Sequence, residues 1–293
     1  MLTVTLLTAP ARAALDPALV ESLRNAWGGG EARWLAPDEA AEFDIPARPD
    51  TADETWQELQ KLGVDLCLQA AAGRRRRLLL ADMDSTMIGQ ECIDELAGMA
   101  GVGPRVAAIT ARAMNGELDF EEALCERVGL LKGLDEGVIA QVLDQRITLA
   151  PGGPVLVATM RANGAHTALV SGGFTAFTVH VARLLGFDEH RANRLLSDED
   201  GLLTGMVARP ILGRDAKVAA LEEICARLGI GTDSALAVGD GANDLGMILR
   251  AGTGVALHAK PAVAAQAPIR INHGDLTALL YLQGYAKDEF VPA

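Results

Sequence analysis

Short apolar runs alternate with stretches of helical spacing through the last three quarters of the chain. The runs LLLA, AHTALV, SALAVG and GTGVALH have the length and composition of buried parallel strands. Between them, PGGPVLVATMRANG and DAKVAALEEICARLGI place apolar residues at the intervals of an amphipathic helix. Strands that alternate with helices in this way predict an α/β fold, in which a doubly wound parallel sheet carries helices on both faces.

A long helical stretch interrupts this alternation. From about residue 88 to residue 149 the chain has few β-branched runs, and its apolar residues recur at helical spacing, as in ELDFEEALCERVGLLKGL. The stretch begins soon after the first strand of the predicted sheet. We therefore expect a small helical cap, inserted into a main unit that covers residues 74–293.

The first 73 residues predict a separate, smaller α+β unit. Residues 2–8 alternate between apolar and polar positions as a strand does, and residues 16–27 have helical spacing after an Asp–Pro start. Three glycines end that helix, and residues 31–34 return as a second strand. We interpret this β-α-β beginning as a small N-terminal unit in which no catalytic pattern is visible.

Composition and charge are those of an ordinary globular protein. Of the 293 residues, 49% are hydrophobic and 22% are charged, which allows a sizeable core. The formal net charge of −13 argues against a surface that binds nucleic acid. We interpret the one basic run, residues 74–77, as a solvated junction before a strand rather than as a phosphate-binding patch.

The cysteines and the N-terminus indicate a cytoplasmic protein. The four cysteines are far apart and form no zinc-binding pattern, which favours reduced thiols over disulfides. They are Cys67, Cys92, Cys125 and Cys225. The first residues lack the basic region of a signal peptide, and no apolar run is long enough to span a bilayer, so we expect no membrane partner.

Polar or glycine-rich turns follow three of the predicted strands: DMDST, SGG and GDGAND. In an open parallel sheet the carboxyl ends of the strands meet at one edge, where ligands bind. The first and third turns supply four carboxylates, from Asp82, Asp84, Asp240 and Asp244. Four carboxylates in one crevice repel one another unless a hard divalent cation lies among them.

Hydrogen-bond donors complete this predicted site. Ser171 offers a hydroxyl, Gly172 a backbone N–H and Lys217 an ammonium. Carboxylates with a cation on one side and donors on the other favour a site for phosphoryl chemistry.

Each turn taken alone has another interpretation. DMDST could begin a calcium loop, but Met87 and Ile93 stand where that loop needs glycine and glutamate. SGG could be an ordinary glycine turn, and GDGAND a hairpin turn that does not fit the dinucleotide-binding glycine pattern. The order of all three, each after an apolar run and with Lys217 between the last two, favours the phosphoryl site.

DMDST, SGGF, the lysine of DAKVAAL and VGDGAND resemble the four motifs of the haloacid dehalogenase-like phosphatases. The stretches STMIGQECIDELAG and ITARAMNGELDFEEALCERVGLLKGL resemble the cap of the phosphoserine phosphatases in that superfamily. The resemblance runs from about residue 78 to about residue 280. Residues 1–73 lie outside it, in the place where longer bacterial members carry an ACT-like regulatory region.

The resemblance and the residues agree on the chemistry that we expect. Asp82 is the nucleophile, because a carboxylate is already ionised at neutral pH, and the resemblance implies a phospho-aspartyl intermediate. Asp84 protonates the leaving alcohol and then deprotonates the attacking water. Ser171, Gly172 and Lys217 hold the phosphoryl oxygens.

The cation and the remaining ligands follow from the same resemblance. The cation is expected to be Mg²⁺, held by Asp82, by the backbone carbonyl of Asp84 and by Asp240, with Asp244 in support. Asn243 contacts the substrate or orients a neighbouring group.

In the cap, the resemblance implies that Glu91 meets the substrate ammonium and Arg127 grips its carboxylate. Met114 and Phe120 are expected to cover the ligand. Solvated surface charges and a helical core are the corresponding alternatives for these two pairs of residues.

The favoured function is hydrolysis of O-phospho-L-serine to L-serine and phosphate, the final step of L-serine biosynthesis. A phosphatase or phosphotransferase that acts on another small phosphate ester is the alternative within enzymes. A metal-binding regulatory module without catalysis is the alternative from another class. The sequence leaves the oligomeric state open, with a homodimer as one option.

Overall fold

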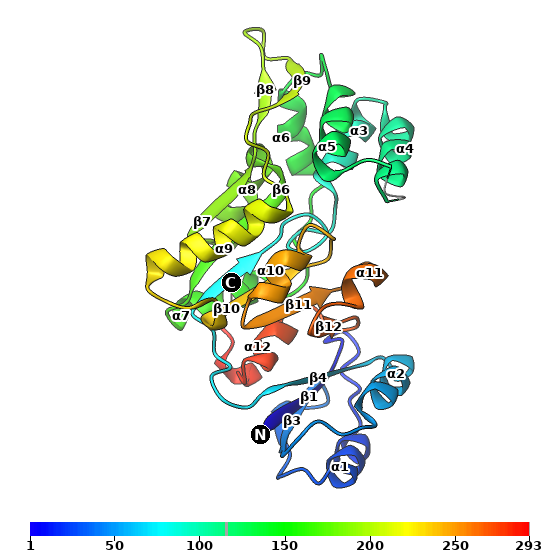
Figure 1. The fold of residues 1–293 in the computed structure, drawn as a ribbon, viewed down its shortest axis with the longest axis vertical. Coiled ribbons are helices and arrows are strands. Elements are labelled where there is room, and N and C mark those ends of the chain that lie inside the picture. Colours follow the sequence, from blue (N-terminus) through cyan, green and yellow to red (C-terminus); the bar gives the residue numbers. More distant parts are fainter. Residues whose placement is uncertain (115–116, 293) are drawn as a thin grey trace.

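The computed structural model describes residues 1–114 and 117–292, and it does not describe the side chain of Met114. Figure 1 shows three layers along the long axis: the N-terminal unit at one end, a central sheet with its helices, and a helical cap at the other end. No helix in the described part of the chain combines the length and the apolar character needed to cross a bilayer.

The central sheet has six parallel strands, in the order β12-β11-β10-β5-β6-β7. This confirms the predicted α/β fold. The strands in sequence order are β5 (Leu78–Ala81), β6 (His166–Phe174), β7 (Glu189–Asn193), β10 (Ala235–Gly239), β11 (Thr253–Leu257) and β12 (Ile269–Ile271).

Helices cover both faces of this sheet. Leu78 and Leu80 point toward α9 and α10, whereas Leu79 and Ala81 point toward α7, α8 and α12. The helices are α7 (Gly153–Ala162), α8 (Thr175–Leu185), α9 (Arg214–Leu228), α10 (Leu245–Arg250), α11 (Pro261–Ala264) and α12 (Ala278–Leu282). Because β5 is buried on both faces, its sequence is continuously apolar rather than alternating.

The cap lies over the carboxyl ends of the strands. It contains the helices α3 (Cys92–Met99), α4 (Gly103–Met114), α5 (Phe120–Gly129) and α6 (Gly137–Gln145). A hairpin of β8 (Leu195–Ser197) and β9 (Leu203–Val207) packs beside α5 in the same layer (Figure 1). The hairpin comes from a segment well after the helical insertion, and the sequence pattern did not predict it.

The N-terminal unit is an antiparallel four-stranded sheet with two helices, in strand order β2-β3-β1-β4. Its elements are β1 (Leu2–Thr8), α1 (Pro17–Ala26), β2 (Arg33–Ala36), β3 (Ala40–Ile45), α2 (Ala52–Leu62) and β4 (Val64–Ala70). The β-α-β prediction therefore covers only the first half of a β-α-β-β-α-β arrangement. Asp16 caps α1 as its side chain accepts a hydrogen bond from the Ala18 N–H at 2.8 Å.

Buried polar contacts fasten this unit to the rest of the molecule. The fully buried Asp65 of β4 accepts hydrogen bonds from the backbone N–H groups of Asn272, His273 and Gly274, at 2.8–3.0 Å. The Tyr281 hydroxyl of α12 donates to Glu39 at 2.7 Å, which gives the C-terminal segment a structural role. A carboxylate that is buried with such partners is costly to detach, so the two units are held firmly together.

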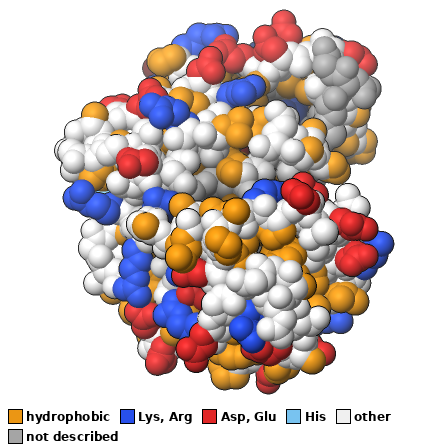
Figure 2. Space-filling model, turned by 60° about the horizontal axis from the view of Figure 1, so that its bottom comes forward, with side chains coloured by type: hydrophobic (Ala, Val, Ile, Leu, Met, Phe, Trp, Pro, Cys, Tyr) orange, Lys and Arg blue, Asp and Glu red, His pale blue; other side chains and the backbone are white. Residues whose placement is uncertain are grey.

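The surface shows no concentration of one sign of charge on the face drawn in Figure 2. There, Lys and Arg side chains alternate with Asp and Glu, and hydrophobic side chains gather between them. On this face, therefore, the described residues form no continuous basic stripe.

Candidate active site

The site is built first from the loop that follows β5. Asp82 is 5% exposed, and its backbone N–H donates to the Val238 carbonyl of β10 at 3.0 Å. The chain then turns tightly, with the Met87 N–H donating to the Met83 carbonyl at 2.9 Å and both methionine side chains fully buried. The buried methionines anchor the turn, so Asp82 and Asp84 are held at the carboxyl end of β5.

Lys217 lies between two carboxylates. Its Nζ is 2.7 Å from Asp82 Oδ1 and 2.5 Å from Asp244 Oδ1, and the Lys217 side chain has no exposed surface. Burial lowers the pKa of Lys217, but Asp244 and Asp82 outweigh it and hold that pKa above its ordinary value. Lys217 therefore remains an ammonium that faces Asp82.

The carboxylate of Asp244 is hydrogen-bonded to other groups of the protein. Besides Lys217, it accepts hydrogen bonds from the backbone N–H groups of Asp240 at 3.2 Å and Gly241 at 2.9 Å. These contacts close the turn after β10. Their effect is to fix the direction of the neighbouring Asp240, which also accepts a hydrogen bond from the Thr86 hydroxyl at 3.2 Å.

A divalent cation fits these carboxylates. Oxygens of Asp82, Asp240 and Asp244 all lie within 4.8 Å of one another, and the three residues are buried. Burial and then Asp244 raise the pKa of Asp240 to about 6, and they also raise the pKa of Asp82. Crowded, poorly hydrated carboxylates of this kind are stabilised by a hard cation, which would lower both pKa values again.

Asp84 sits in a different environment. Its carboxyl group accepts hydrogen bonds from the Cys92 N–H at 2.9 Å and the Ser171 hydroxyl at 3.2 Å. Burial and the nearby Glu91 raise the pKa of Asp84 to about 6. A carboxyl group with such a pKa is suited to both giving and accepting a proton near neutral pH.

The glycines after Ser171 leave room for Asp84 and for a ligand. A Cβ on Gly173 would lie 2.4 Å from Asp84 Oδ2, so no other residue fits there without displacing that carboxyl group. The Gly173 N–H donates to Ser171 Oγ at 2.8 Å, which orients the hydroxyl toward Asp84. Asn243 lies across from Gly172, with its Nδ2 3.3 Å from the position of a Cβ there.

A cavity of about 440 Å³ joins the sheet edge to the cap. Asp82, Asp84, Gly172, Asp240 and Asn243 line it from the sheet. Glu91, Phe120 and Arg127 line it from the cap. The structure thus brings these predicted residues to one space, with Ser171, Lys217 and Asp244 buried directly behind it.

The two charged cap residues are held differently. Glu91 accepts a hydrogen bond from the Ser85 hydroxyl at 2.8 Å, and Ser85 adopts a left-handed φ of 55° to reach it. Arg127 extends from the last turn of α5, where its Nε donates to the Ala123 carbonyl at 3.1 Å. Among the described residues, the terminal guanidinium nitrogens of Arg127 make no hydrogen bond, so they can bind a ligand.

The side chain of one predicted residue is not described, and several residues at the site were not predicted. Met114 ends α4, but its side chain lies outside the described residues. The sequence interpretation missed Ser85, Thr86 and Gly173, although all three stand within or beside its quoted motifs. It also missed Arg214 and Lys260, exposed cations at the cavity, because a lone basic residue gives no pattern.

Comparison with known proteins identifies the family. The model of the haloacid dehalogenase-like hydrolases matches residues 79–249. The chain belongs to the haloacid dehalogenase-like hydrolase family. Within it, the chain falls among the phosphoserine phosphatases: the phosphoserine phosphatase of Albidiferax ferrireducens is 48% identical over 211 residues, which are 70% of this chain and 89% of the relative.

A second relative is longer than this chain. The phosphoserine phosphatase of Haemophilus influenzae is 47% identical over 205 residues, which are 70% of this chain but 65% of the relative. The match thus spans less than two thirds of that protein.

Two solved structures share the fold. A HAD family hydrolase of Salmonella enterica serovar Typhi has a TM-score of 0.85 at 30% identity. The match covers 99% of this chain and 100% of the Salmonella chain. A phospho-aspartyl intermediate analogue of a phosphoserine phosphatase has a TM-score of 0.66 at 40% identity. The match covers 71% of this chain and 98% of the solved chain. The first includes the N-terminal unit in the match.

Proposed function

We propose that this protein is a Mg²⁺-dependent phosphoserine phosphatase, which hydrolyses O-phospho-L-serine to L-serine and phosphate. One observation carries the proposal: the Asp82–Asp84 pair opens into the same cavity as Glu91 and Arg127. The pair supplies the chemistry of phosphoryl transfer, and the cap supplies charges complementary to an amino acid. The relatives named phosphoserine phosphatase support the same substrate.

In the first half of the proposed reaction, a carboxylate oxygen of Asp82 attacks phosphorus and the bond from phosphorus to the serine oxygen breaks. Lys217, 2.7 Å from Asp82, favours the ionised nucleophile and faces the phosphoryl oxygens. Asp84, with its raised pKa, gives a proton to the serine oxygen, so that L-serine leaves as a neutral alcohol.

In the second half, Asp84 takes a proton from a water molecule, whose oxygen attacks phosphorus. The bond from phosphorus to Asp82 breaks, and phosphate and the free carboxylate are restored. The solved phospho-aspartyl analogue of a related phosphatase supports such an intermediate. Ser171 and Gly172 hold the phosphoryl group through both halves, by a hydroxyl and a backbone N–H.

Asp82, Asp240 and the backbone carbonyl of Asp84 are the proposed ligands of Mg²⁺. The bound ion would supply positive charge against the phosphoryl oxygens. Asp244 is proposed to support the metal site without binding the ion directly, because its oxygens already accept hydrogen bonds from Lys217, Asp240 and Gly241. In that position it orients Asp240 and Lys217.

The cap is proposed to select the substrate. Arg127 would bind the serine carboxylate with two parallel hydrogen bonds, and Glu91 would bind the ammonium. Phe120 lies 3.0 Å from the position of a Cβ on Gly172, so its ring closes the cavity over the phosphoryl end. Asn243 would contact the substrate from the opposite side. Met114, at the end of α4, is proposed to cover the ligand.

The cellular setting and the domain division are part of the proposal. Residues 1–73 would form an ACT-like regulatory unit, and residues 74–293 the phosphatase with its cap at about 88–149. All four cysteines are free, which suits the reducing cytoplasm in which L-serine is made. We propose L-serine biosynthesis as the pathway. A homodimer is one option for the oligomeric state, and analytical sedimentation tests it.

Phosphate release from O-phospho-L-serine, with Mg²⁺ and with excess chelator, tests the function. The proposal predicts turnover with Mg²⁺, loss of turnover with chelator and recovery when Mg²⁺ is restored. A panel of other small phosphate esters tests the alternative substrate. Absence of phosphate release from every ester would favour a metal-binding module without catalysis.

A further inference from the structure

Asn193, the last residue of β7, is a buried residue whose side chain makes a set of hydrogen bonds that no catalytic motif includes. The residue is 3% exposed. Its Nδ2 donates to the Gly172 carbonyl at 2.8 Å and to the Leu212 carbonyl at 3.2 Å, and its Oδ1 accepts from the Leu212 N–H at 2.7 Å. One side-chain amide thus joins two backbone segments that lie 40 residues apart.

Both segments lead into the proposed phosphoryl site. Gly172 follows Ser171 at the end of β6, and its N–H is a proposed phosphoryl donor. Leu212 lies two residues before α9, whose first turn carries Lys217. The Lys217 N–H donates to the Gly213 carbonyl at 3.2 Å, so the position of Leu212 is passed on to the lysine through a single turn of backbone.

Only an amide of this size satisfies all three backbone groups. The Leu212 N–H requires an acceptor, and the two carbonyls require donors on the opposite side of the same side chain. Asparagine offers both from one planar group. Aspartate would keep the acceptor but would turn a second oxygen toward two carbonyl oxygens. Alanine would leave three backbone polar groups without their partner.

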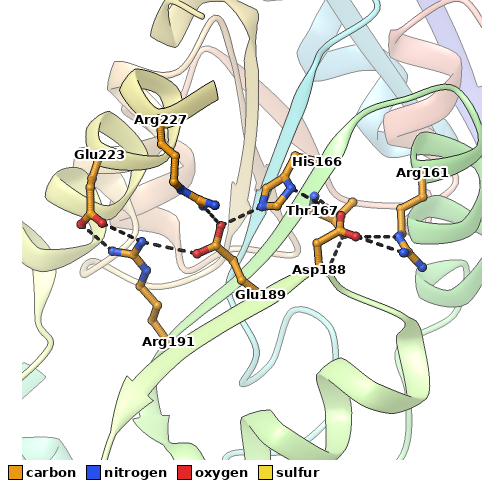
Figure 3. Close-up of polar contacts among 8 residues, drawn as sticks. All are labelled: Arg161, His166, Thr167, Asp188, Glu189, Arg191, Glu223 and Arg227. Carbon is orange, nitrogen blue, oxygen red and sulfur yellow. Dashed lines mark hydrogen bonds and ion pairs between the residues drawn. The ribbon is translucent and has the colours of Figure 1, made fainter. Parts of the chain in front are cut away.

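The other end of β7 is tied to the same two elements, but at the surface. Figure 3 shows Glu189 between His166 of β6, at 2.7 Å, and Arg227 of α9, with Arg191 paired to Glu223 of α9 at 2.8 Å. Ion pairs that are partly open to solvent, as these are, contribute little to stability. Buried apolar side chains pack β6 against α9, and Asn193 adds a polar link between the end of β6 and the residues that lead into α9, next to the site.

We propose that Asn193 is a positioning residue for phosphoryl transfer, which sets the separation between the Ser171–Gly172 donors and Lys217. This inference rests on the proposed function of those donors. Asn193 itself touches neither the cavity nor a predicted catalytic side chain. Its effect on the reaction passes through Gly172 and through the start of α9.

The test compares Asn193→Ala, Asn193→Asp and a control on the same strand, Arg191→Ala. Misplacement of catalytic groups by about 1 Å costs on the order of 100-fold in rate. We therefore expect kcat/KM for phosphoserine to fall by about that factor in Asn193→Ala, and by at least as much in the isosteric Asn193→Asp. Arg191→Ala, which removes partly exposed ion pairs to Glu189 and Glu223, should keep the wild-type value.

Two further measurements separate positioning from folding and from the substrate assignment. Circular dichroism at the assay temperature gives the folded fraction, by which each rate is divided. Binding of orthovanadate in the presence of Mg²⁺ reports on the phosphoryl site whatever the natural substrate is. We expect vanadate affinity to fall in both Asn193 variants and to be unchanged in Arg191→Ala.

The outcomes are distinct. Asn193 variants that are less stable but keep wild-type kcat/KM and vanadate affinity per folded molecule would overturn the inference. If the wild type fails to hydrolyse phosphoserine, the proposed function fails. The vanadate comparison then decides on Asn193 by itself, since unchanged affinity refutes the positioning role and reduced affinity supports it.

Discussion

Lys217 and Asp244 form an ion pair of 2.5 Å in which neither side chain has any exposed surface. The lysine also lies 2.7 Å from Asp82, so one buried positive charge is shared by two carboxylates. An ammonium and a carboxylate removed from water are tolerated because each compensates the other. The phosphoryl site is therefore built on a charge arrangement that also holds the fold together.

The first prediction concerns this pair. Lys217→Ala should lower the free energy of unfolding by about 3–5 kcal/mol, because it leaves two buried carboxylates without their ammonium. Asp244→Ala should lower it by less, because Asp82 still compensates Lys217. The double variant should lose clearly less than the sum of the two. Urea denaturation of the metal-free protein measures the three values.

The two single variants and the double variant form a double-mutant cycle, and an ion pair on the surface serves as its control. Arg250 Nε lies 2.9 Å from Glu222 Oε1, and both side chains are about half exposed. Its double-mutant cycle should show a much smaller coupling than that of Lys217 and Asp244. Additive losses at Lys217 and Asp244 would mean that the two residues do not depend on each other.

The second prediction concerns the nucleophile. Asp82→Asn keeps the size of the side chain but removes the attacking charge, so kcat should fall by several orders of magnitude while the fold survives. Phosphate release and mass spectrometry of the quenched enzyme measure turnover and the covalent phosphoryl group. Asp198→Asn, at the turn of the β8–β9 hairpin, should behave as the wild type. A tenth of wild-type activity in Asp82→Asn would exclude the covalent mechanism.

The position of the site was predictable because neighbouring parallel strands have their carboxyl ends at the same edge of the sheet. Residues 78–81 and 235–239 are apolar runs that stop at an aspartate, and their strands β5 and β10 are neighbours in the sheet. Local sequence therefore placed Asp82 and Asp240 together without any knowledge of long-range contacts. Helical spacing likewise predicted the cap, since periodicity is a local property.

The second half of the N-terminal unit was missed because its pattern depends on distant partners. β4 contains a buried aspartate, Asp65, which argues against a strand until the N–H groups of residues 272–274 are seen to satisfy it. β3 places Glu42 on its buried side, where Arg33 and Arg74 compensate it. Asn193 is a similar case, because its partners lie 19 and 21 residues away and a single asparagine carries no periodicity.

The third prediction concerns substrate choice. A phosphate ester that lacks the carboxylate still meets Ser171 and Lys217, but it leaves Arg127 without a partner. An unpaired charge in a closed site costs about 2–5 kcal/mol, which is roughly 30- to several-thousand-fold in specificity. Wild-type enzyme should prefer phosphoserine to a simple alkyl phosphate by a factor in that range.

Arg127→Ala should remove most of that preference by slowing phosphoserine alone. Specificity constants for both substrates measure the effect. Arg112→Ala is the matched control in the cap, because Arg112 pairs with Glu126 at 2.8 Å on the exposed surface and should leave both constants unchanged. Equal slowing of both substrates by Arg127→Ala would give Arg127 a structural role instead.

The last prediction concerns acid stability at the junction of the two units. The Glu42 carboxylate of β3 accepts hydrogen bonds from Arg74 Nη1 at 2.7 Å and from Arg33 Nε at 3.1 Å. Burial raises the pKa of Glu42, but the two arginines outweigh it and bring that pKa below its ordinary value of 4.5. Because the pKa is lower in the folded state, Glu42 contributes stability that is complete above about pH 4.5 and lost as the pH falls through the folded value.

Glu42→Gln isolates that contribution, because it keeps the shape and removes the charge. The wild type should exceed Glu42→Gln in free energy of unfolding at neutral pH, and the difference should shrink as the pH falls below about 4.5. Urea denaturation at a series of pH values measures it. Glu21→Gln, which removes an exposed carboxylate from α1, should follow the wild type throughout. A difference between wild type and Glu42→Gln that stays constant with pH would show that Glu42 acts through its packing, and that its charge does not hold the N-terminal unit to Arg74.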